Sequence, residues 1–212
     1  MKRTVKYELL SLPGWSRAEG IRMIFHMAGV EYDDVRLTVP EWRLFKVKAS
    51  LPPEVRLPIL RIKTHCIVAG TVPIARTLAR QYGMYGESAI EERDIEEIIR
   101  YVDQIHDALL PIIRHTLTKD YEKRKAYWMD FKDNVLNPTL DYLERKLRNN
   151  DYFVSDQITA ADLIVAEVLS RFVNLFDQNI LKTYPRLEEH RLRIENQPQL
   201  QQLVQNRPKS VF

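Results

Sequence analysis

The periodicity of the apolar residues changes at residues 83–89, and this change limits the fold more than any single motif. Before it, short β-branched and aliphatic runs alternate with helical patterns, and after it only helical patterns remain. Gly83, Gly86 and small polar residues interrupt every periodicity between the two parts. The sequence therefore predicts an α/β N-terminal domain (residues 1–82), a linker (83–90) and an all-α C-terminal domain (91–212).

The composition excludes several classes of protein. A net charge of +3 over 212 residues, with Lys and Arg mixed among acids, does not favour nucleic acid binding. No apolar run approaches membrane-spanning length, and Lys6 and Glu8 interrupt any signal-peptide core, so we expect a cytoplasmic protein with no membrane partner. The single cysteine, Cys66, excludes an intramolecular disulfide and, in its apolar run, is expected to be buried and inert. No histidine has metal-ligand spacing, so no metal is implied.

The first half shows strands and a helix in alternation. Residues 5–10 and 32–37 are predicted strands. Ser16 and Glu19 match a capping box, which predicts that a helix begins there, between the two strands. Residues 40–53 are interpreted as a long polar and aromatic connection.

Residues 55–71 combine a proline-marked strand with a helix start. Pro58 cannot donate to a central ladder, so it belongs at the start or edge of the strand. Leu57 is then held extended, with its backbone free to pair with something other than protein. Thr71 offers a side-chain oxygen where the next helix begins, a place suited to anions. An extended peptide with a free carboxylate fits both features, and an ordinary hairpin with a proline at its edge is the alternative.

The second half reads as helices throughout. Apolar residues at 95–109 trace one face of a long helix, and residues 120–148 continue a helical pattern across Pro138, which predicts a kink. Thr159 and Asp162 form a capping box at the start of another helix. Two more helices are predicted near residues 185–195 and 198–206.

Several motifs occur together in a particular order: RAE at 17–19 leading into IRMIFHMAGVEYDD, EW at 41–42, LPIL at 57–60, TLARQYGMYG at 77–86 and YFVSDQITAADL at 152–163. In order and spacing the chain resembles the cytosolic glutathione transferases, in particular the sigma-like group that includes nematode-type enzymes, prostaglandin D synthase and the S-crystallins. The resemblance implies a thioredoxin-like N-terminal domain, an all-α C-terminal domain, a homodimer and reduced glutathione as co-substrate.

The resemblance also implies a glutathione site, on Trp42, Lys46, Arg56, Leu57, Pro58, Gly70, Thr71 and Glu96. In the family's pattern, the Leu57 backbone pairs with the tripeptide beside a cis proline, here Pro58. Thr71 occupies the position of the residue that binds the γ-glutamyl carboxylate. Lys46 and Trp42 occupy the positions of the pair that binds the glycyl end. Glu96 matches an acid that reaches across the dimer. Each also has an ordinary interpretation, as loop packing or solvated charge.

The catalytic position departs from the family. An ungapped alignment places Ser11 where the family has its catalytic tyrosine, while Arg17 matches the arginine near the thiol. Arg56 and Gly70 replace two glutamines that help to bind the tripeptide. A serine is much shorter than a tyrosine, so Ser11 works only if the strand or the tripeptide shifts towards it. Ser16 is a less favoured donor because the predicted cap uses its hydroxyl.

The sequence therefore predicts a transferase that conjugates the glutathione thiolate to small hydrophobic electrophiles in detoxification, with weak activity because of Ser11. The alternative is a non-catalytic binding or structural protein of the same fold, as the S-crystallins are. Candidates for the electrophile site, which serve equally well as domain-interface core, are Leu12, Trp15, Ile105, Leu109 and Phe212.

Overall fold

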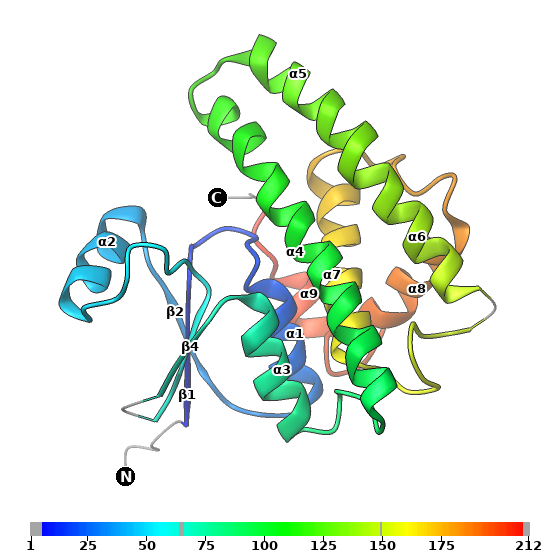
Figure 1. Cartoon of the computed structure of the whole chain (residues 1–212), viewed down its shortest axis with the longest axis horizontal. Coiled ribbons are helices and arrows are strands. Elements are labelled where there is room, and N and C mark those ends of the chain that lie inside the picture. The colour runs from blue at the N-terminus through cyan, green and yellow to red at the C-terminus, as the bar shows by residue number, and fades with distance from the viewer. Residues whose placement is uncertain (1–5, 64–65, 149, 210–212) are drawn as a thin grey trace.

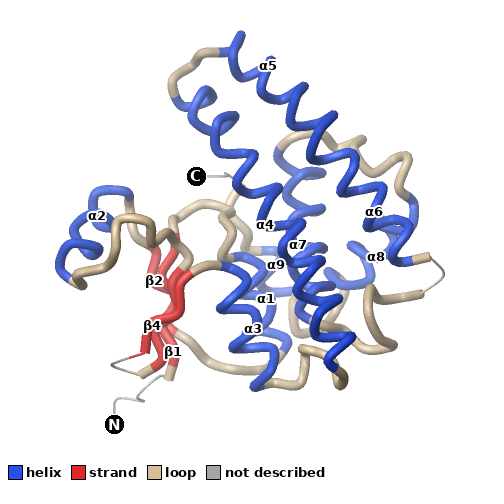
Figure 2. Tube along the Cα trace, in the orientation of Figure 1, coloured by secondary structure: helices blue, strands red, loops and turns tan. Residues whose placement is uncertain are grey.

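A small sheet with its helices lies beside a larger group of helices, as Figures 1 and 2 show. The computed structural model describes residues 6–63, 66–148 and 150–209. The predicted fold class, an α/β N-terminal part followed by an all-α C-terminal part, is confirmed. The limits 1–82, 83–90 and 91–212 stay a prediction.

The sheet has the strand order β2-β1-β3-β4. The central strand β1 (Tyr7–Ser11) is parallel to β2 (Asp33–Arg36) and antiparallel to β3 (Ile59–Ile62), which pairs with β4 (Cys66–Ala69). Ser11, at the end of β1, therefore lies near the residues that lead into β3. The expectation for Cys66 was wrong: its side chain is exposed, because β4 is the edge strand and its first residues face solvent.

Helices α1 (Glu19–Met27) and α3 (Thr71–Gln81) lie between the sheet and the helical part, and α2 (Val39–Lys48) lies on the other side (Figure 1). Interpreting residues 40–53 as a connection was wrong, because most of α2 lies within them. No residue of α2 is buried, so this helix has no apolar face to reveal it. A capping box between Thr38 and Glu41 begins it.

The predicted capping box at Ser16 was also wrong. The helix begins at Glu19 with Ala18 as its N-cap, which has no side-chain cap. The Glu19 carboxylate instead accepts hydrogen bonds from Arg22 at 3.1 Å and from Arg207 at 3.2 Å. A tertiary ion pair therefore takes the place of the local cap.

The helical part has α4 as its longest element. Its elements are α4 (Ala89–Leu117), α5 (Tyr121–Phe131), the π-helical turn η1 (Lys132–Leu136), α6 (Asn137–Leu147), α7 (Ala160–Leu175), α8 (Pro185–Glu195) and α9 (Gln201–Gln205). The segment across Pro138 is continuous, as predicted, and the irregularity is the π-helical turn just before the proline.

Helix α7 is the buried centre of the helical part and also packs on α1. A Cβ atom at Gly20 would lie 2.9 Å from the Ile164 Cγ1 atom, so the α1–α7 contact depends on a glycine there. The side chains of Met84 and Tyr85 are buried between the two parts, and the Ala160 amide donates to the Met84 carbonyl at 2.9 Å. Among the described residues, no helix is both long and apolar enough to cross a bilayer.

The capping box of α7 is confirmed, and Asp162 does more than cap. Its buried carboxylate accepts hydrogen bonds from the Thr159 amide at 2.8 Å and the Thr159 hydroxyl at 2.7 Å. It also contacts the Phe153 amide at 3.0 Å and His190 Nε2 at 2.9 Å. One carboxylate thus joins the loop before α7 to α8.

We expect Asp162→Ala to lower the free energy of unfolding by about 3 kcal/mol, since it leaves several buried donors without an acceptor. Thr159→Ala removes only the threonine hydroxyl and should cost about 1 kcal/mol. Urea unfolding followed by circular dichroism measures both. Equal losses for the two variants would show that Asp162 acts only as a cap.

Candidate functional site

A cavity of about 230 Å³ lies where the end of β1, the start of α2, the loop before β3 and one face of α4 meet. It brings together six predicted site residues: Ser11, Arg17, Trp42, Arg56, Leu57 and Pro58. Its remaining wall is Leu12, Ser16, Val39 and Leu110. Residues far apart in the sequence thus form one concave surface with an apolar wall and two guanidinium groups.

The loop before β3 presents backbone groups to this cavity. The Leu57–Pro58 peptide bond is cis, as the resemblance implies. The Gly70 amide donates to the Pro58 carbonyl at 3.0 Å, which ties this loop to the start of α3. Within the part of the chain that the structure describes, neither the amide nor the carbonyl of Leu57 forms a backbone hydrogen bond. Leu57 therefore offers a free donor and a free acceptor at the cavity.

Thr71 is the first residue of α3, and Gly70, with φ of 93°, is its N-cap. The threonine therefore lies at the start of the helix, as expected, but is not its N-cap. Its side chain is 2% exposed, and within the described ranges its hydroxyl makes no hydrogen bond of ordinary length, although it lies near enough to the Asp103 carboxylate of α4 to help lower the pKa of that group. A buried hydroxyl without such a bond is costly and uncommon in native proteins, so its position at a helix N-terminus marks a place for a ligand.

Arg17 is held by two carboxylates of α4. Its guanidinium group donates to Asp103 at 3.4 Å and to Asp107 at 2.5 Å. Burial alone would raise the pKa of Asp103, but contact with His106 and the charge of Arg17 lower it below its usual range. Sequence reasoning missed both aspartates, although their spacing of four residues places them on one face of a helix. The charge of Arg17 at the cavity is thus partly balanced.

Ser11 is bound by a guanidinium group that the sequence analysis did not single out. Arg22 donates to the Ser11 hydroxyl at 2.6 Å, and that hydroxyl donates to the Leu12 carbonyl at 3.1 Å. Ser11 and Arg22 are each 1% exposed. Burial lowers the pKa of Arg22, but Asp34 and Glu19 outweigh it and raise the pKa, so the side chain stays charged. In the sequence, the available signal was a charged residue, Arg22, directly beside the apolar positions of α1.

Trp42 and Lys46 lie one turn apart on α2. The Lys46 ammonium lies 5.6 Å from the Trp42 ring centroid, a distance at which a cation and an aromatic ring attract. It also donates a short hydrogen bond to the Pro53 carbonyl. Only Trp42 of this pair lines the cavity.

Glu96 lies away from these residues. Its carboxylate accepts hydrogen bonds from Arg76 at 2.5 Å and Arg100 at 2.9 Å, and Tyr85 donates a short hydrogen bond to it. The hydrogen bond from Arg76 lowers the pKa of Glu96. Within one chain this carboxylate does not reach the cavity, so its role across a dimer stays a prediction.

The proposed electrophile-site residues divide into two groups. Trp15, Ile105 and Leu109 are at most 4% exposed, and the Trp15 indole donates to Glu167 at 2.8 Å, so these three form interface core. Leu12 lines the cavity, and Phe212 lies outside the described residues. In the described ranges no group of three or more His, Cys, Asp or Glu side chains could hold a metal ion.

The chain is similar to known proteins over nearly its whole length. Residues 106–207 match the family model for the glutathione S-transferase C-terminal domain. S-crystallin SL11 of Nototodarus sloanii is 30% identical over 97% of this chain and 98% of its own, and glutathione S-transferase 3 of Caenorhabditis elegans is 29% identical over 98% and 100%. A Nu-class glutathione S-transferase from Haemonchus contortus has a TM-score of 0.81 at 32% identity, covering 97% of this chain and 98% of its own. The chain belongs to the glutathione S-transferase family.

Proposed function

We propose that this protein binds reduced glutathione in the cavity at Leu57 and transfers its thiolate to small hydrophobic electrophiles. The observation that carries the proposal is the combination of a free backbone edge at Leu57 with a buried hydroxyl at Thr71 that makes no hydrogen bond of ordinary length among the described residues. Relatives named glutathione S-transferase, about as long as this chain, support it.

The proposed binding mode follows from the groups on offer. The Leu57 amide and carbonyl pair with the cysteinyl backbone as an added strand would. The γ-glutamyl carboxylate accepts hydrogen bonds from the Thr71 hydroxyl and from the amides at the start of α3. The helix dipole favours an anion at this place. Lys46 and Trp42 bind the glycyl end of the tripeptide. For this, the Lys46 ammonium breaks its hydrogen bond to the Pro53 carbonyl.

We propose that Ser11 stabilises the thiolate. Lowering a thiol pKa by about two units requires about 2.7 kcal/mol of preferential thiolate stabilisation, and a hydrogen bond to a charged group supplies about 1.5 to 3 kcal/mol. To donate to the thiolate, the Ser11 hydroxyl gives up its bond to the Leu12 carbonyl and keeps the one it accepts from Arg22. The Arg22 cation polarises the hydroxyl and makes it a stronger donor.

A second candidate function is binding without catalysis. The Ser11 hydroxyl already has a donor and an acceptor inside the protein, and two of the relatives are S-crystallins. In this case glutathione binds, but its thiol is not activated.

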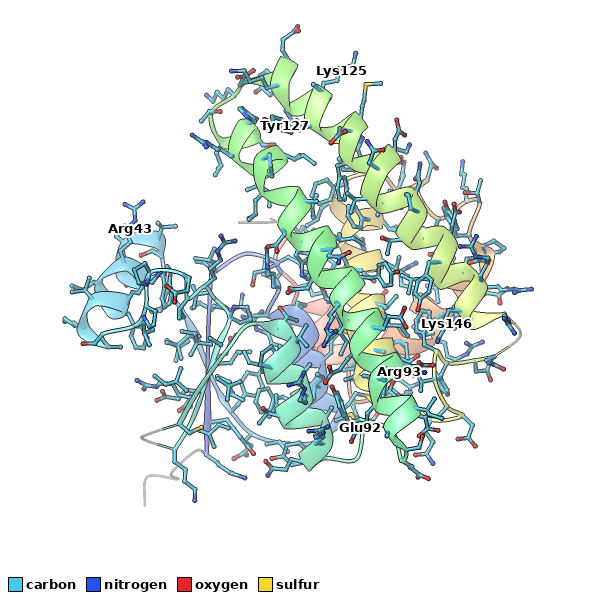
Figure 3. The ribbon with its side chains drawn as sticks, in the orientation of Figure 1. Arg43, Glu92, Arg93, Lys125, Tyr127 and Lys146 are labelled. Atoms are coloured by element: carbon cyan, nitrogen blue, oxygen red, sulfur yellow. The ribbon has the colours of Figure 1, made fainter. Side chains whose placement is uncertain are left out.

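We further propose a cytoplasmic homodimer that acts in detoxification. One face of α4 carries a groove of about 570 Å³ with both signs of charge, including Glu92 and Arg93, which Figure 3 shows near the first turns of the helix. In a two-fold dimer this face of one subunit meets the same face of the other, so its cations and anions pair across the contact. Sedimentation of the purified chain, with Arg93→Glu as the variant, tests the dimer.

We expect Thr71→Val to weaken glutathione binding by about tenfold or more, because it removes a hydrogen bond to a carboxylate. The same substitution should leave stability unchanged or raise it, since the buried hydroxyl makes no hydrogen bond of ordinary length among the described residues. Titration calorimetry and urea unfolding measure the two effects. Thr77→Val is the matched control on α3, as the Thr77 hydroxyl bonds only to the Pro73 carbonyl. Equal affinities for the two variants would contradict this binding mode.

Ser11→Ala should lower kcat with 1-chloro-2,4-dinitrobenzene by about tenfold and raise the apparent pKa of the kcat profile, with little change in glutathione affinity. Ser16→Ala removes the other hydroxyl of the cavity, whose predicted cap is absent, and should behave as the wild type if Ser11 is the donor; a loss with Ser16→Ala alone would assign the donor to Ser16. An inactive wild type together with an active Ser11→Tyr would establish the non-catalytic function. Failure of the wild type to bind glutathione at all would exclude both candidates.

A further inference from the structure

A buried polar cluster joins α4 to α7 close to the loop that contains Arg17 (Figure 1). Its members are His106 of α4 and Glu167 and Arg171 of α7, and their exposed fractions are 3%, 0% and 5%. Charged groups are costly to bury unless they are paired, so their presence in a helix interface needs a reason. Nothing in the proposed binding mode uses this cluster, although His106 lies beside the aspartate that binds Arg17.

The two members on α7 balance each other's charge. The Arg171 Nε atom lies 3.3 Å from the Glu167 carboxylate, and the Trp15 indole donates to the same carboxylate at 2.8 Å. Burial alone would raise the pKa of Glu167, but the charge of Arg171 lowers it below its usual range. The pair is therefore ionised and neutral overall, and His106 is not needed to balance it.

The contact between Arg171 and His106 assigns the proton of the imidazole ring. A guanidinium group can only donate hydrogen bonds, and the Arg171 Nη2 atom makes a short contact with the His106 Nε2 atom. The Nε2 atom therefore accepts, since a protonated ring would set two cations against each other. The ring is neutral, and its one proton lies on Nδ1.

The Nδ1 atom of His106 faces Asp103, one turn earlier on α4. It lies 3.9 Å from the Asp103 Oδ1 atom and makes no hydrogen bond of ordinary length with any residue that the structure describes. The same Oδ1 atom lies 3.4 Å from the Arg17 Nη1 atom. A small rotation of either side chain brings the N–H group and the carboxylate within hydrogen-bond distance. The imidazole thus directs a donor at the oxygen that binds Arg17.

We propose that His106 is a positioning residue, which acts through Asp103 to keep the Arg17 guanidinium group at the glutathione sulfur. The inference rests on the proposed function, since it concerns the thiolate of the bound tripeptide. Arg17, Ser11 and Leu57 line one cavity, so a cation fixed there stabilises a thiolate whose backbone pairs with Leu57.

Arg17 needs this support because a second carboxylate competes for it. Asp107 is nearer to the guanidinium group, at 2.5 Å, but its side chain is 57% exposed, against 32% for Asp103. Water and salt weaken the outer pair more than the inner one. When His106 does not hold Asp103 in place, Arg17 follows Asp107 toward solvent and stabilises the thiolate less.

Two substitutions of His106 separate the roles of the two ring nitrogens. His106→Asn keeps an amide group near the position of Nδ1, whereas His106→Gln keeps one near the position of Nε2 only. Ultraviolet absorption of the thiolate measures the pKa of the bound glutathione thiol on the full chain, and titration calorimetry measures the affinity. His115→Gln is the matched control, because His115 lies on the same helix, stacks on Tyr127 and does not line the cavity.

We expect His106→Gln to raise the pKa of the bound thiol by about half a unit or more, because Arg17 is less well placed. At a pH below that pKa the thiolate fraction, and with it kcat, should fall about threefold. The affinity for glutathione should change by less than about twofold, since the residue touches no ligand. His106→Asn should restore most of the shift, and His115→Gln should cause none.

A double variant tests whether His106 acts through Asp103. Asp103→Asn removes the carboxylate that the imidazole orients and should itself change the pKa of the bound thiol. Adding His106→Gln to Asp103→Asn should cause no further shift, because the two residues act in series. Circular dichroism shows whether each variant is folded.

Three results overturn the proposal: an unchanged thiol pKa in His106→Gln, equal shifts for His106→Gln and His106→Asn, or shifts that add in the double variant. An unchanged thiol pKa in Asp103→Asn also overturns it, even where His106→Gln does not fold. A wild type that binds no glutathione overturns the proposed function as well. A wild type that binds glutathione, with variants that show no shift, overturns only the role of His106.

Discussion

The buried guanidinium group of Arg22 is the interaction on which the arrangement of the N-terminal part depends. It bonds to Ser11 at the end of β1, to Asp34 on β2 and to Glu19 on α1. Glu19 in turn binds Arg207 from the segment after α9. Leaving any one of these charges buried without its partner costs about 3 to 5 kcal/mol, so they are retained as a set. The cluster therefore fixes β1, α1 and the C-terminal segment relative to one another.

Because of this cluster, the position of Ser11 depends on the packing of the buried core. A catalytic tyrosine reaches a thiol with a long side chain, but a short serine side chain depends on where its backbone lies. The pairing of β1 with β2 and the Leu37 amide, which donates to the Ser11 carbonyl at 2.8 Å, hold that backbone in place. The hydroxyl can turn, because only its bond to the Leu12 carbonyl must break, but it cannot travel. If the protein is a transferase, the tripeptide must therefore come to Ser11, and the backbone pairing at Leu57 sets how closely it approaches.

Sequence patterns correctly predicted features formed by neighbouring residues. They failed where the partner of a side chain lies far away in the sequence. The capping box at Thr159 and Asp162 was correct because both groups lie within one turn of the helix. The similar pattern at Ser16 and Glu19 was wrong because the carboxylate binds Arg207, which is 188 positions away. Helix α2 was missed because it buries nothing, so its sequence has no periodicity. Of the site, six of the cavity residues followed from the family resemblance, whereas the contacts that Arg22 and Asp103 make with Ser11 and Arg17 required the tertiary structure.

Helix α4 explains how one small protein presents several separate surfaces. Leu110 lines the cavity at Leu57, and Asp103 and Asp107 bind Arg17 at the same cavity, while Ile112, Ile113 and Thr116 line a cavity of about 740 Å³ at the C-terminal end of the helix. With 3.6 residues per turn, Ile112 points about 160° away from Leu110 around the helix axis, whereas Ile113 points only about 60° away from it. The two cavities therefore lie against neighbouring turns of one helix, although they share no lining residue.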